Sequence, residues 1–334
     1  MRLRTLAVTA GVLAALAAAA FLSSRTLSAP PADPRVGGRL VDPDTVNKAA
    51  ALRLSDQGKT ILLTRAPDGS WTDASYYGMP ADFSKLSGFT GDLAAATIGR
   101  LVTSSPASLA RLGFKDTQIA LLDASGRELW SASLGKSPDS GGRFVRFPGE
   151  DRAYLANLSS WIDTDPKAWA NSQLIDLRPE DVARVRAGFD GGATLTLSRA
   201  RKDADWSADG APVHRRVAAD KVASLLATLG TLRFSDTSDP ADPQAAAARR
   251  NARTFALTTF DGRTFTISLG RKPEEKAAKG SAAPNPAGPV FALVTCSDAA
   301  APVNGLMTRR TFQVDEYAFT SLPQKPGELF EPAL

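Results

Sequence analysis

A long segment of this chain of 334 residues occurs twice. Three landmarks recur at nearly the same offset along the chain: Trp71 as Trp206, Leu134-Gly135-Lys136 as Leu269-Gly270-Arg271, and Val41-Asp42-Pro43 as Leu177-Arg178-Pro179. Because three independent landmarks at one spacing are hard to obtain by chance, we interpret the chain as two homologous modules in tandem. The modules are predicted over residues 41–170 and 174–323, with residues 324–334 as a C-terminal tail. The duplication constrains the architecture and leaves the chemistry open.

The first module has the sequence signals of an antiparallel sheet with a helix. Leu52 and Leu54 alternate with polar residues, and further strand patterns follow a turn at residues 56–58. A helical region is predicted from about residue 82 to 102, broken near residues 88–91. After a short helical turn, the remaining strands are expected at residues 119–122, 129–134, 144–147 and 153–155.

The second module repeats this order with clearer signals. An amphipathic helix is predicted with Asp220 near its start and Gly230 just past its end, because apolar residues fall at i, i+3, i+4 and i+7: Val222, Leu225, Leu226 and Leu229. Asp261-Gly262 divides the strand patterns of residues 253–269 and predicts a hairpin. Residues 272–289, rich in Lys, Ala, Gly and Pro, are predicted as a solvated loop. Each module is therefore expected to be α+β, an antiparallel sheet with a helix packed on one face.

The N-terminus predicts export. A basic start precedes an uncharged apolar run over residues 6–22, which as a helix covers roughly 25 Å against a hydrocarbon core of about 30 Å. Residues 1–25 are therefore either a signal anchor or a signal peptide cleaved after Ala20. The excess of arginine before the run holds the N-terminus in the cytoplasm. We expect a single-pass protein of the inner membrane, with a linker over residues 26–40 and the bulk of the chain in the periplasm.

Composition argues against nucleic acid as a partner. The formal charge is +5, but without Arg2, Arg4 and Arg25 it falls to +2, so no dense basic surface remains to release counterions. The single cysteine, Cys296, cannot form an internal disulfide and is expected to be a small buried side chain.

Several landmarks of the chain resemble those of a known bacterial family. They are Gly69-Ser70-Trp71 at the end of a strand pair, Pro80-Ala81-Asp82 at a helix start, Leu112-Gly113-Phe114, and Phe144-Val145-Arg146 after a Leu-Gly-Lys. Across residues 41–323 this pattern is similar to the bacterial domain of unknown function 4340 family. The resemblance implies an envelope protein with one N-terminal membrane segment, often encoded beside ABC-type permeases of the gliding-motility type and their auxiliary component. The second module lacks a counterpart to Leu112-Gly113-Phe114, so a function shared equally by both modules is not implied.

The search for catalytic motifs gives no candidate residue. One histidine, His214, and one cysteine cannot supply a tetrahedral zinc site. Ser133 and Lys136 have the Ser-x-x-Lys spacing of penicillin-binding enzymes, but they lie at a predicted strand end and the partner motifs are absent. No nucleophile elbow, phosphate-binding glycine loop or nucleotide fingerprint occurs. We therefore predict no catalytic, cofactor-binding or metal-binding residues.

Two acidic pairs and two tryptophans have both a structural and a functional interpretation. Asp163 with Asp165, and Asp236 with Asp239, could offer oxygens to calcium, but they lack the spacing of a binding loop and are typical of turns. The tryptophans at equivalent positions could stack on a sugar or a peptide, but we expect them to close the core of each sheet.

Two classes of function remain. The first is a non-enzymatic, membrane-tethered scaffold or accessory protein that binds a membrane protein, such as an ABC permease or its auxiliary component. The alternative is an exported hydrolase that acts on an envelope polymer. Perturbed carboxylates in a deep cleft would favour the hydrolase, and a shallow apolar patch would favour the scaffold.

Overall fold

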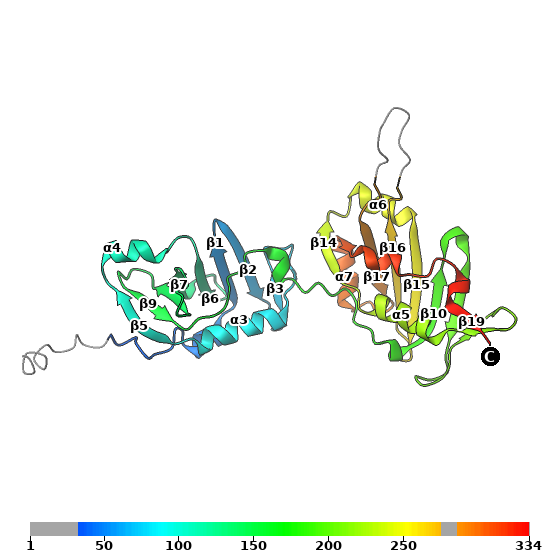
Figure 1. Ribbon diagram of the computed structural model, residues 1–334, viewed down its shortest axis with the longest axis horizontal. Helices are drawn as coiled ribbons and strands as arrows, with labels where there is room; N and C mark the ends of the chain where they lie inside the picture. Colours follow the sequence, from blue (N-terminus) through cyan, green and yellow to red (C-terminus); the bar gives the residue numbers. More distant parts are fainter. Residues whose placement is uncertain (1–32, 275–285, 334) are drawn as a thin grey trace, which may run out of the picture. The chain divides into compact units, whose positions relative to one another are not determined.

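The computed structural model describes residues 33–274 and 286–333 and divides into two compact units, Met1–Ala170 and Asn171–Leu334 (Figure 1). Both are mixed α+β structures built on antiparallel sheets. The predicted membrane segment, residues 1–25, lies outside the described residues. Among the residues that are described, no helix is both long and apolar enough to span a membrane.

In the described part of the first unit, one sheet has the strand order β4-β3-β2-β1-β6-β7-β8-β9-β5. Its strands are β1 (Ala51–Asp56), β2 (Lys59–Arg65), β3 (Trp71–Asp73), β4 (Met79–Pro80), β5 (Ile98–Thr103), β6 (Gln118–Leu122), β7 (Glu128–Leu134), β8 (Arg143–Arg146) and β9 (Ala153–Ala156). Its helices are α2 (Pro43–Lys48), α3 (Phe83–Ala95) and α4 (Pro106–Leu109), with 3₁₀ turns η1 (Ala110–Leu112) and η2 (Pro166–Trp169).

The predicted helix over residues 82–102 is wrong in its second half. The helix α3 runs unbroken through Gly88 and Gly91 and ends at Ala95, and residues 98–103 form strand β5. Asp82 caps the start, because its side chain accepts a hydrogen bond from the Lys85 amide at 3.0 Å. The strand at residues 98–103 depends on pairing with β9, which lies far along the chain, so it cannot be recognised from local periodicity.

In the described part of the second unit, the main sheet has the order β12-β11-β10-β15-β16-β17-β18-β14, and β13 pairs with β19 in a small ribbon. The strands are β10 (Val182–Gly188), β11 (Thr194–Ser198), β12 (Ser207–Ala208), β13 (Arg215–Val217), β14 (Phe234–Ser238), β15 (Ala252–Thr259), β16 (Thr264–Arg271), β17 (Val290–Cys296), β18 (Thr311–Val314) and β19 (Phe330–Pro332). The helices are α5 (Ala219–Gly230), α6 (Pro243–Arg250), α7 (Pro302–Arg309) and α8 (Glu316–Thr320), with 3₁₀ turns η3 (Pro179–Asp181), η4 (Asp190–Gly192) and η5 (Pro326–Leu329).

The predicted helix and hairpin of the second unit are confirmed. In α5 the residues at i, i+3, i+4 and i+7 are buried: Val222, Leu225, Leu226 and Leu229. Strands β15 and β16 pair in continuous register from Ala252 with Gly270 to Thr258 with Thr264, around the Asp261-Gly262 turn. Beyond residue 323, where a tail was predicted, η5 and β19 continue the unit, and β19 pairs with β13.

The main sheets of the two units follow the same strand order. Each strand of the second sheet has a counterpart in the first. The order β12-β11-β10-β15-β16-β17-β18-β14 corresponds strand by strand to β3-β2-β1-β6-β7-β8-β9-β5. The helix α3 precedes β5 as α5 precedes β14, and α4 precedes β6 as α6 precedes β15. Trp71 begins β3 and Trp206 directly precedes β12, while Gly135 directly follows β7 and Gly270 lies near the end of β16.

Candidate functional site

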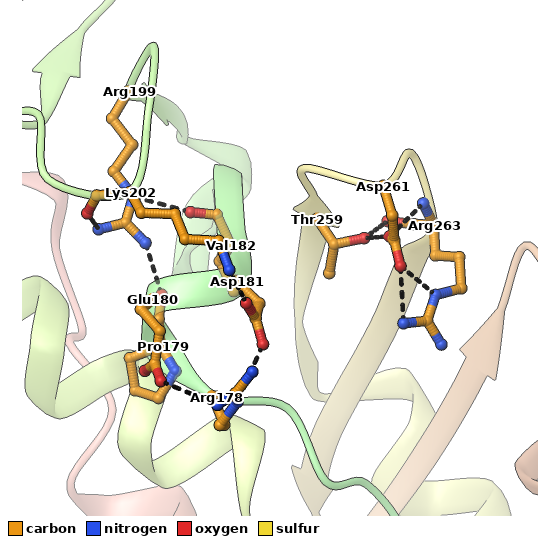
Figure 2. Close-up of polar contacts among 10 residues, drawn as sticks. All are labelled: Arg178, Pro179, Glu180, Asp181, Val182, Arg199, Lys202, Thr259, Asp261 and Arg263. Atoms are coloured by element: carbon orange, nitrogen blue, oxygen red, sulfur yellow. Dashed lines mark hydrogen bonds and ion pairs between the residues drawn. The ribbon is translucent and has the colours of Figure 1, made fainter.

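A hollow of about 400 Å³ opens on the second unit where η3 lies close to the turn between β15 and β16. The backbone joins the two elements, because the Phe260 amide donates to the Asp181 carbonyl oxygen at 3.0 Å. Figure 2 shows the polar contacts around it. Charged side chains of both signs dominate the lining of this charged hollow: Asp176, Leu177, Arg178, Asp181, Lys202, Thr259, Phe260, Asp261 and Arg263.

Asp181 is the acceptor on the η3 side of the charged hollow. Pro179 occupies the first position of η3, where its missing N–H costs no hydrogen bond. The Asp181 carboxylate accepts from Lys202 Nζ at 2.6 Å and from Arg178 Nε at 3.1 Å. The hydrogen bond from Lys202 holds the pKa of Asp181 below its ordinary value, so this carboxylate is ionised at neutral pH.

Asp261 plays the same part on the turn side. Its carboxylate accepts hydrogen bonds from the Thr259 hydroxyl and from Arg263 Nε, the latter at 2.9 Å. Gly262 sits at φ +89°, a conformation that L side chains rarely adopt and that the Asp-Gly sequence provides in a tight turn. The hydrogen bond from Arg263 lowers the pKa of Asp261 to about 2.

Arg199 fixes the backbone behind these carboxylates. Its guanidinium donates to three carbonyl oxygens, of Val182 at 2.9 Å, Lys202 at 2.8 Å and Pro179 at 2.6 Å. It also lies 4.6 Å from the centroid of the Trp206 ring. Burial lowers the pKa of Arg199, with opposing contributions from Glu180 and Asp181, but an arginine with this many acceptors stays charged. Arg199 therefore sets the position from which Lys202 reaches Asp181.

This arrangement is suited to binding and poorly suited to acid–base chemistry. A general acid or base works best with a pKa near the operating pH, whereas the pKa values of Asp181 and Asp261 are both lowered. The ion pairs are solvent-accessible, so each contributes little to stability and can exchange partners at low cost. The charged hollow can therefore accept a polar, charged segment of a partner.

Asp73, in the first unit, has a carboxylate with a raised pKa. Asp73 is fully buried at the end of β3, and its Oδ1 accepts from the amides of Ser75 at 2.8 Å and Tyr76 at 3.1 Å. Its Oδ2 receives no hydrogen bond from the part of the chain that the structure describes. Desolvation raises the pKa of Asp73 to about 6. The contacts of Asp73 are those of a turn that the buried carboxylate organises.

The residues considered above as possible catalytic or metal-binding groups, namely Ser133, Lys136, His214 and Cys296, do not line the charged hollow. Ser133 is in strand β7 and Lys136 follows it, so the two side chains do not share a helix face, as predicted. His214 is in an exposed turn with φ +60°. Cys296 is buried at the end of β17, which confirms its interpretation as a small core side chain.

Asp163 lies in a turn, where it accepts from the Asp165 amide at 3.0 Å. Asp163 also accepts from Lys85 Nζ at 2.7 Å, and Asp165 caps η2 by accepting from the Lys167 amide at 3.1 Å. The turn predicted at Asp236 is wrong, because this residue lies in strand β14, where its carboxylate accepts from the Thr237 amide at 2.8 Å. Asp239 accepts from the Ala241 amide at 2.8 Å. Within residues 33–274 and 286–333, no group of three His, Cys, Asp or Glu side chains is placed to hold a metal ion.

The two tryptophans are half-buried. Trp71 packs against the core of the first unit, as expected. Trp206 lies beneath the Arg199 guanidinium and is also only partly buried.

No sequence motif marks the charged hollow. Asp261-Gly262 predicted only a hairpin turn, and Arg178 was noted only as part of a repeated landmark. The available signal is opposite charge at short spacing, Arg178 with Asp181 and Asp261 with Arg263. Nothing in the sequence indicates that these two segments, which lie far apart along the chain, meet in space.

Comparison with known proteins gives one result. A family model described as Domain of unknown function (DUF4340) matches residues 71–251, which extends across parts of both units. No curated protein and no solved structure matches the chain.

Proposed function

The chain belongs to the DUF4340 family of domains of unknown function, and from that premise we propose that it works by binding, as a membrane-tethered scaffold or accessory protein outside the cytoplasm. Residues 1–25 hold it in the inner membrane, and the rest of the chain is periplasmic. Its partner is a membrane protein of an ABC-type transport system, a permease or its auxiliary component. The periplasmic part contributes binding surface and no catalysis.

The observation that supports this proposal is the set of ion pairs and lowered carboxylate pKa values in the charged hollow. The pKa values of Asp181 and Asp261 are lowered, and their carboxylates are held by Lys202, Arg178 and Arg263 in a solvent-accessible setting. Such groups recognise complementary charges and fix the register of a partner, which favours binding over proton transfer.

The tether is supported by contacts at the first described residues. Arg152 pairs with Asp33 at 3.0 Å, Arg35 pairs with Glu150, and the Gly37 amide donates to the Ile98 carbonyl oxygen at 2.7 Å. The seven residues from 26 to 32 reach at most about 25 Å when fully extended. An anchored chain therefore keeps this end of the first unit close to the membrane surface.

We also infer that the two units arose by duplication of one ancestral module. The support is the common strand order together with the matching positions of Trp71 and Trp206 and of Gly135 and Gly270. Under this inference the charged hollow is a later specialisation of the second unit.

Crosslinking in cells tests the binding proposal. A photoreactive residue near the charged hollow in the full-length chain is expected to capture a membrane protein, identified by mass spectrometry. Lys202→Glu is expected to reduce the yield about tenfold, because it places a negative charge beside Asp181. Arg201→Glu is the matched control, since Arg201 is exposed and pairs only with Asp203 among the described residues. Capture of no membrane protein, together with hydrolysis of an envelope polymer by the purified chain, would favour the hydrolase instead.

Topology is tested separately. A reporter enzyme that is active only outside the cytoplasm, fused after Leu334, is expected to be active, and alkaline washing is expected to leave the protein in the membrane fraction. Release by the wash would indicate cleavage after Ala20, and an inactive reporter would overturn the proposed orientation.

A further inference from the structure

A second hollow, of about 180 Å³, lies on the second unit beside α6, α7 and strands β15 to β18. Its apolar lining includes Ala252, Phe291, Leu293 and Met307, and its charged lining consists of Arg249 and Arg310. No acidic side chain is among the lining residues described. We call this hollow the arginine pocket.

The corresponding place in the first unit is filled by an aromatic side chain. Ser133 pairs with Arg146 across β7 and β8 as Ser268 pairs with Leu293 across β16 and β17. Next to this pair, a Cβ placed on Gly135 would lie 3.3 Å from the Phe114 ring. The Arg146 guanidinium lies 5.4 Å from the centroid of the same ring. Phe114 and a neighbouring arginine thus close this face of the first sheet.

The second unit has small residues, Ala248 and Ala252, at the matching place and no aromatic ring from a described residue there. The helix α6 ends at Arg250 and β15 begins at Ala252, whereas five residues separate Leu112, the last residue of η1, from β6 in the first unit. The short connection provides no counterpart to Phe114. Gly270 itself packs against α6, because a Cβ on it would lie 2.2 Å from the Ala248 carbonyl oxygen. The open space lies farther along this face, and Phe291 and Leu293 form part of its wall.

The two arginines give the arginine pocket its polarity. Arg310 Nε donates to the Thr237 hydroxyl at 3.1 Å, which orients the guanidinium. Arg249, exposed in the last turn of α6, makes no ion pair or side-chain hydrogen bond with another described residue. Thr254 and Ser268, also in the lining, hydrogen-bond to each other at 2.8 Å. The pocket therefore combines a compact apolar space with guanidinium donors that suit an anion.

We propose that the arginine pocket binds a carboxylate that is carried beside one compact apolar group. A cavity of about 150 Å³ accommodates a benzene ring, so about 180 Å³ admits one aromatic or branched group and little more. The apolar group packs against Phe291, Leu293 and Met307, and the carboxylate meets Arg249 and Arg310. This chemistry has two sources, the C-terminal residue of a polypeptide and a small aryl or branched-chain acid. The proposal does not depend on the membrane tether or on the charged hollow.

Calorimetric titration of the full-length chain with N-acetylphenylalanine tests the proposal. Saturable binding is expected with a dissociation constant of about 1 mM, the range that a ligand of this size reaches. N-acetylphenylalanine amide, which lacks the carboxylate, is expected to bind at least about tenfold more weakly. Arg249→Gln is expected to weaken binding of the acid by about tenfold. Arg250→Gln, at the adjacent exposed position outside the lining, is the control and is expected to change it less than twofold.

Two further ligands distinguish the sources. A hexapeptide that ends in phenylalanine and binds more tightly than 3-phenylpropanoate would identify a polypeptide C-terminus, and the reverse order would identify a small acid. Equal binding of the acid and the amide would overturn the proposal. So would equal effects of the two arginine substitutions, or the absence of saturable binding by any of these ligands.

Discussion

The two units share a strand order but differ in how they fill corresponding places. Near Gly135 the first unit packs the ring of Phe114, whereas Gly270 of the second unit packs against Ala248 and Ala252 and lies in the lining of the arginine pocket. Two residues after Trp71 the first unit buries Asp73, whereas the residue two after Trp206 is Ala208, which is partly exposed. The first unit thus closes both of these places, and the second leaves them more open. Two sheets with the same strand order can therefore differ in how tightly side chains pack on corresponding faces.

The largest effect is expected where the two units are most alike. A Cβ on Gly135 would lie 2.5 Å from the Leu112 carbonyl oxygen, and one on Gly270 would lie 2.2 Å from the Ala248 carbonyl oxygen. Because the obstacle in each case is backbone, Gly135→Ala and Gly270→Ala are each expected to lower the free energy of unfolding of their own unit by about 3 kcal/mol.

Urea denaturation of each variant measures these losses. Gly88→Ala is the control, because this glycine lies inside α3 with open space around its Cβ position, and the change is expected to stabilise by about 0.5–1 kcal/mol. A loss confined to one of the two matching glycines would mean that the close approach of helix and strand is not a shared feature.

The sequence predicted those helices and strands whose buried residues recur at the regular spacing of the element itself. The apolar stripe of α5 and the Asp-Gly hairpin were readable because each is specified within about 20 residues. Strand β5 was not readable, since its residues are strand-forming only when β9 is beside them. The helix α6 was missed because its run of alanines has no strong apolar stripe, and its burial depends on Phe291.

The candidate sites were less predictable than the fold. The charged hollow joins η3 to the distant turn between β15 and β16, and the arginine pocket joins α6 to α7, so neither has a contiguous motif. The one usable signal was an absence, the missing counterpart of Leu112-Gly113-Phe114 in the second module. In the structure the connection from α6 to β15 is shorter than the one from η1 to β6, and the arginine pocket lies beside α6.

The next largest expected effect is on the free energy of unfolding at Asp73, and it depends on pH. Its folded pKa of about 6 lies above the ordinary 3.8, so the folded state binds the proton more tightly than the unfolded state. Its stabilising contribution is therefore complete below pH 3.8 and is lost as the pH rises through 6. Asp73→Asn keeps the acceptor for the Ser75 and Tyr76 amides and removes the charge, so it is expected to stabilise by about 1–3 kcal/mol at pH 7.5.

Thermal unfolding at pH 4 and pH 7.5 checks this dependence. The gain from Asp73→Asn is expected at pH 7.5 and should largely vanish at pH 4. Asp68→Asn is the control, because Asp68 is exposed and its hydrogen bonds from Ser70 lower its pKa, so no gain is expected. A gain of equal size at both pH values would show that the charge of Asp73 is not the cause.

A smaller difference is expected between two matching arginines. Arg199 precedes Trp206 in the second unit as Arg65 precedes Trp71 in the first, but only Arg199 is tied to three carbonyl oxygens. Arg199→Lys removes the planar fork and is expected to cost about 1–2 kcal/mol. Arg65→Lys, at an exposed position, is expected to change stability by less than about 0.5 kcal/mol. Equal losses on urea denaturation would indicate that both arginines serve the same structural role.

The smallest effect concerns two turns that match in position, Asp123 to Arg127 and Thr259 to Arg263. In the first, the Asp123 carboxylate accepts from Ser125 and from Arg127 Nε, and the Ser125 hydroxyl is the main cause of its lowered pKa. In the second, the Asp261 carboxylate accepts from Thr259 and Arg263, and Arg263 is the main cause. The pKa of Asp261 is lowered to about 2, so its stabilising contribution is present above pH 3.8 and is lost as the pH falls through 2. Carboxyl-carbon NMR is expected to show Asp261 titrating near pH 2, and Arg263→Gln is expected to return its pKa toward 3.8 while leaving Asp123 unchanged. If Asp261 titrated at its ordinary pKa in the unsubstituted chain, the Arg263 contact would not hold in solution, and the charged hollow would lose the ordered turn on which its binding surface depends.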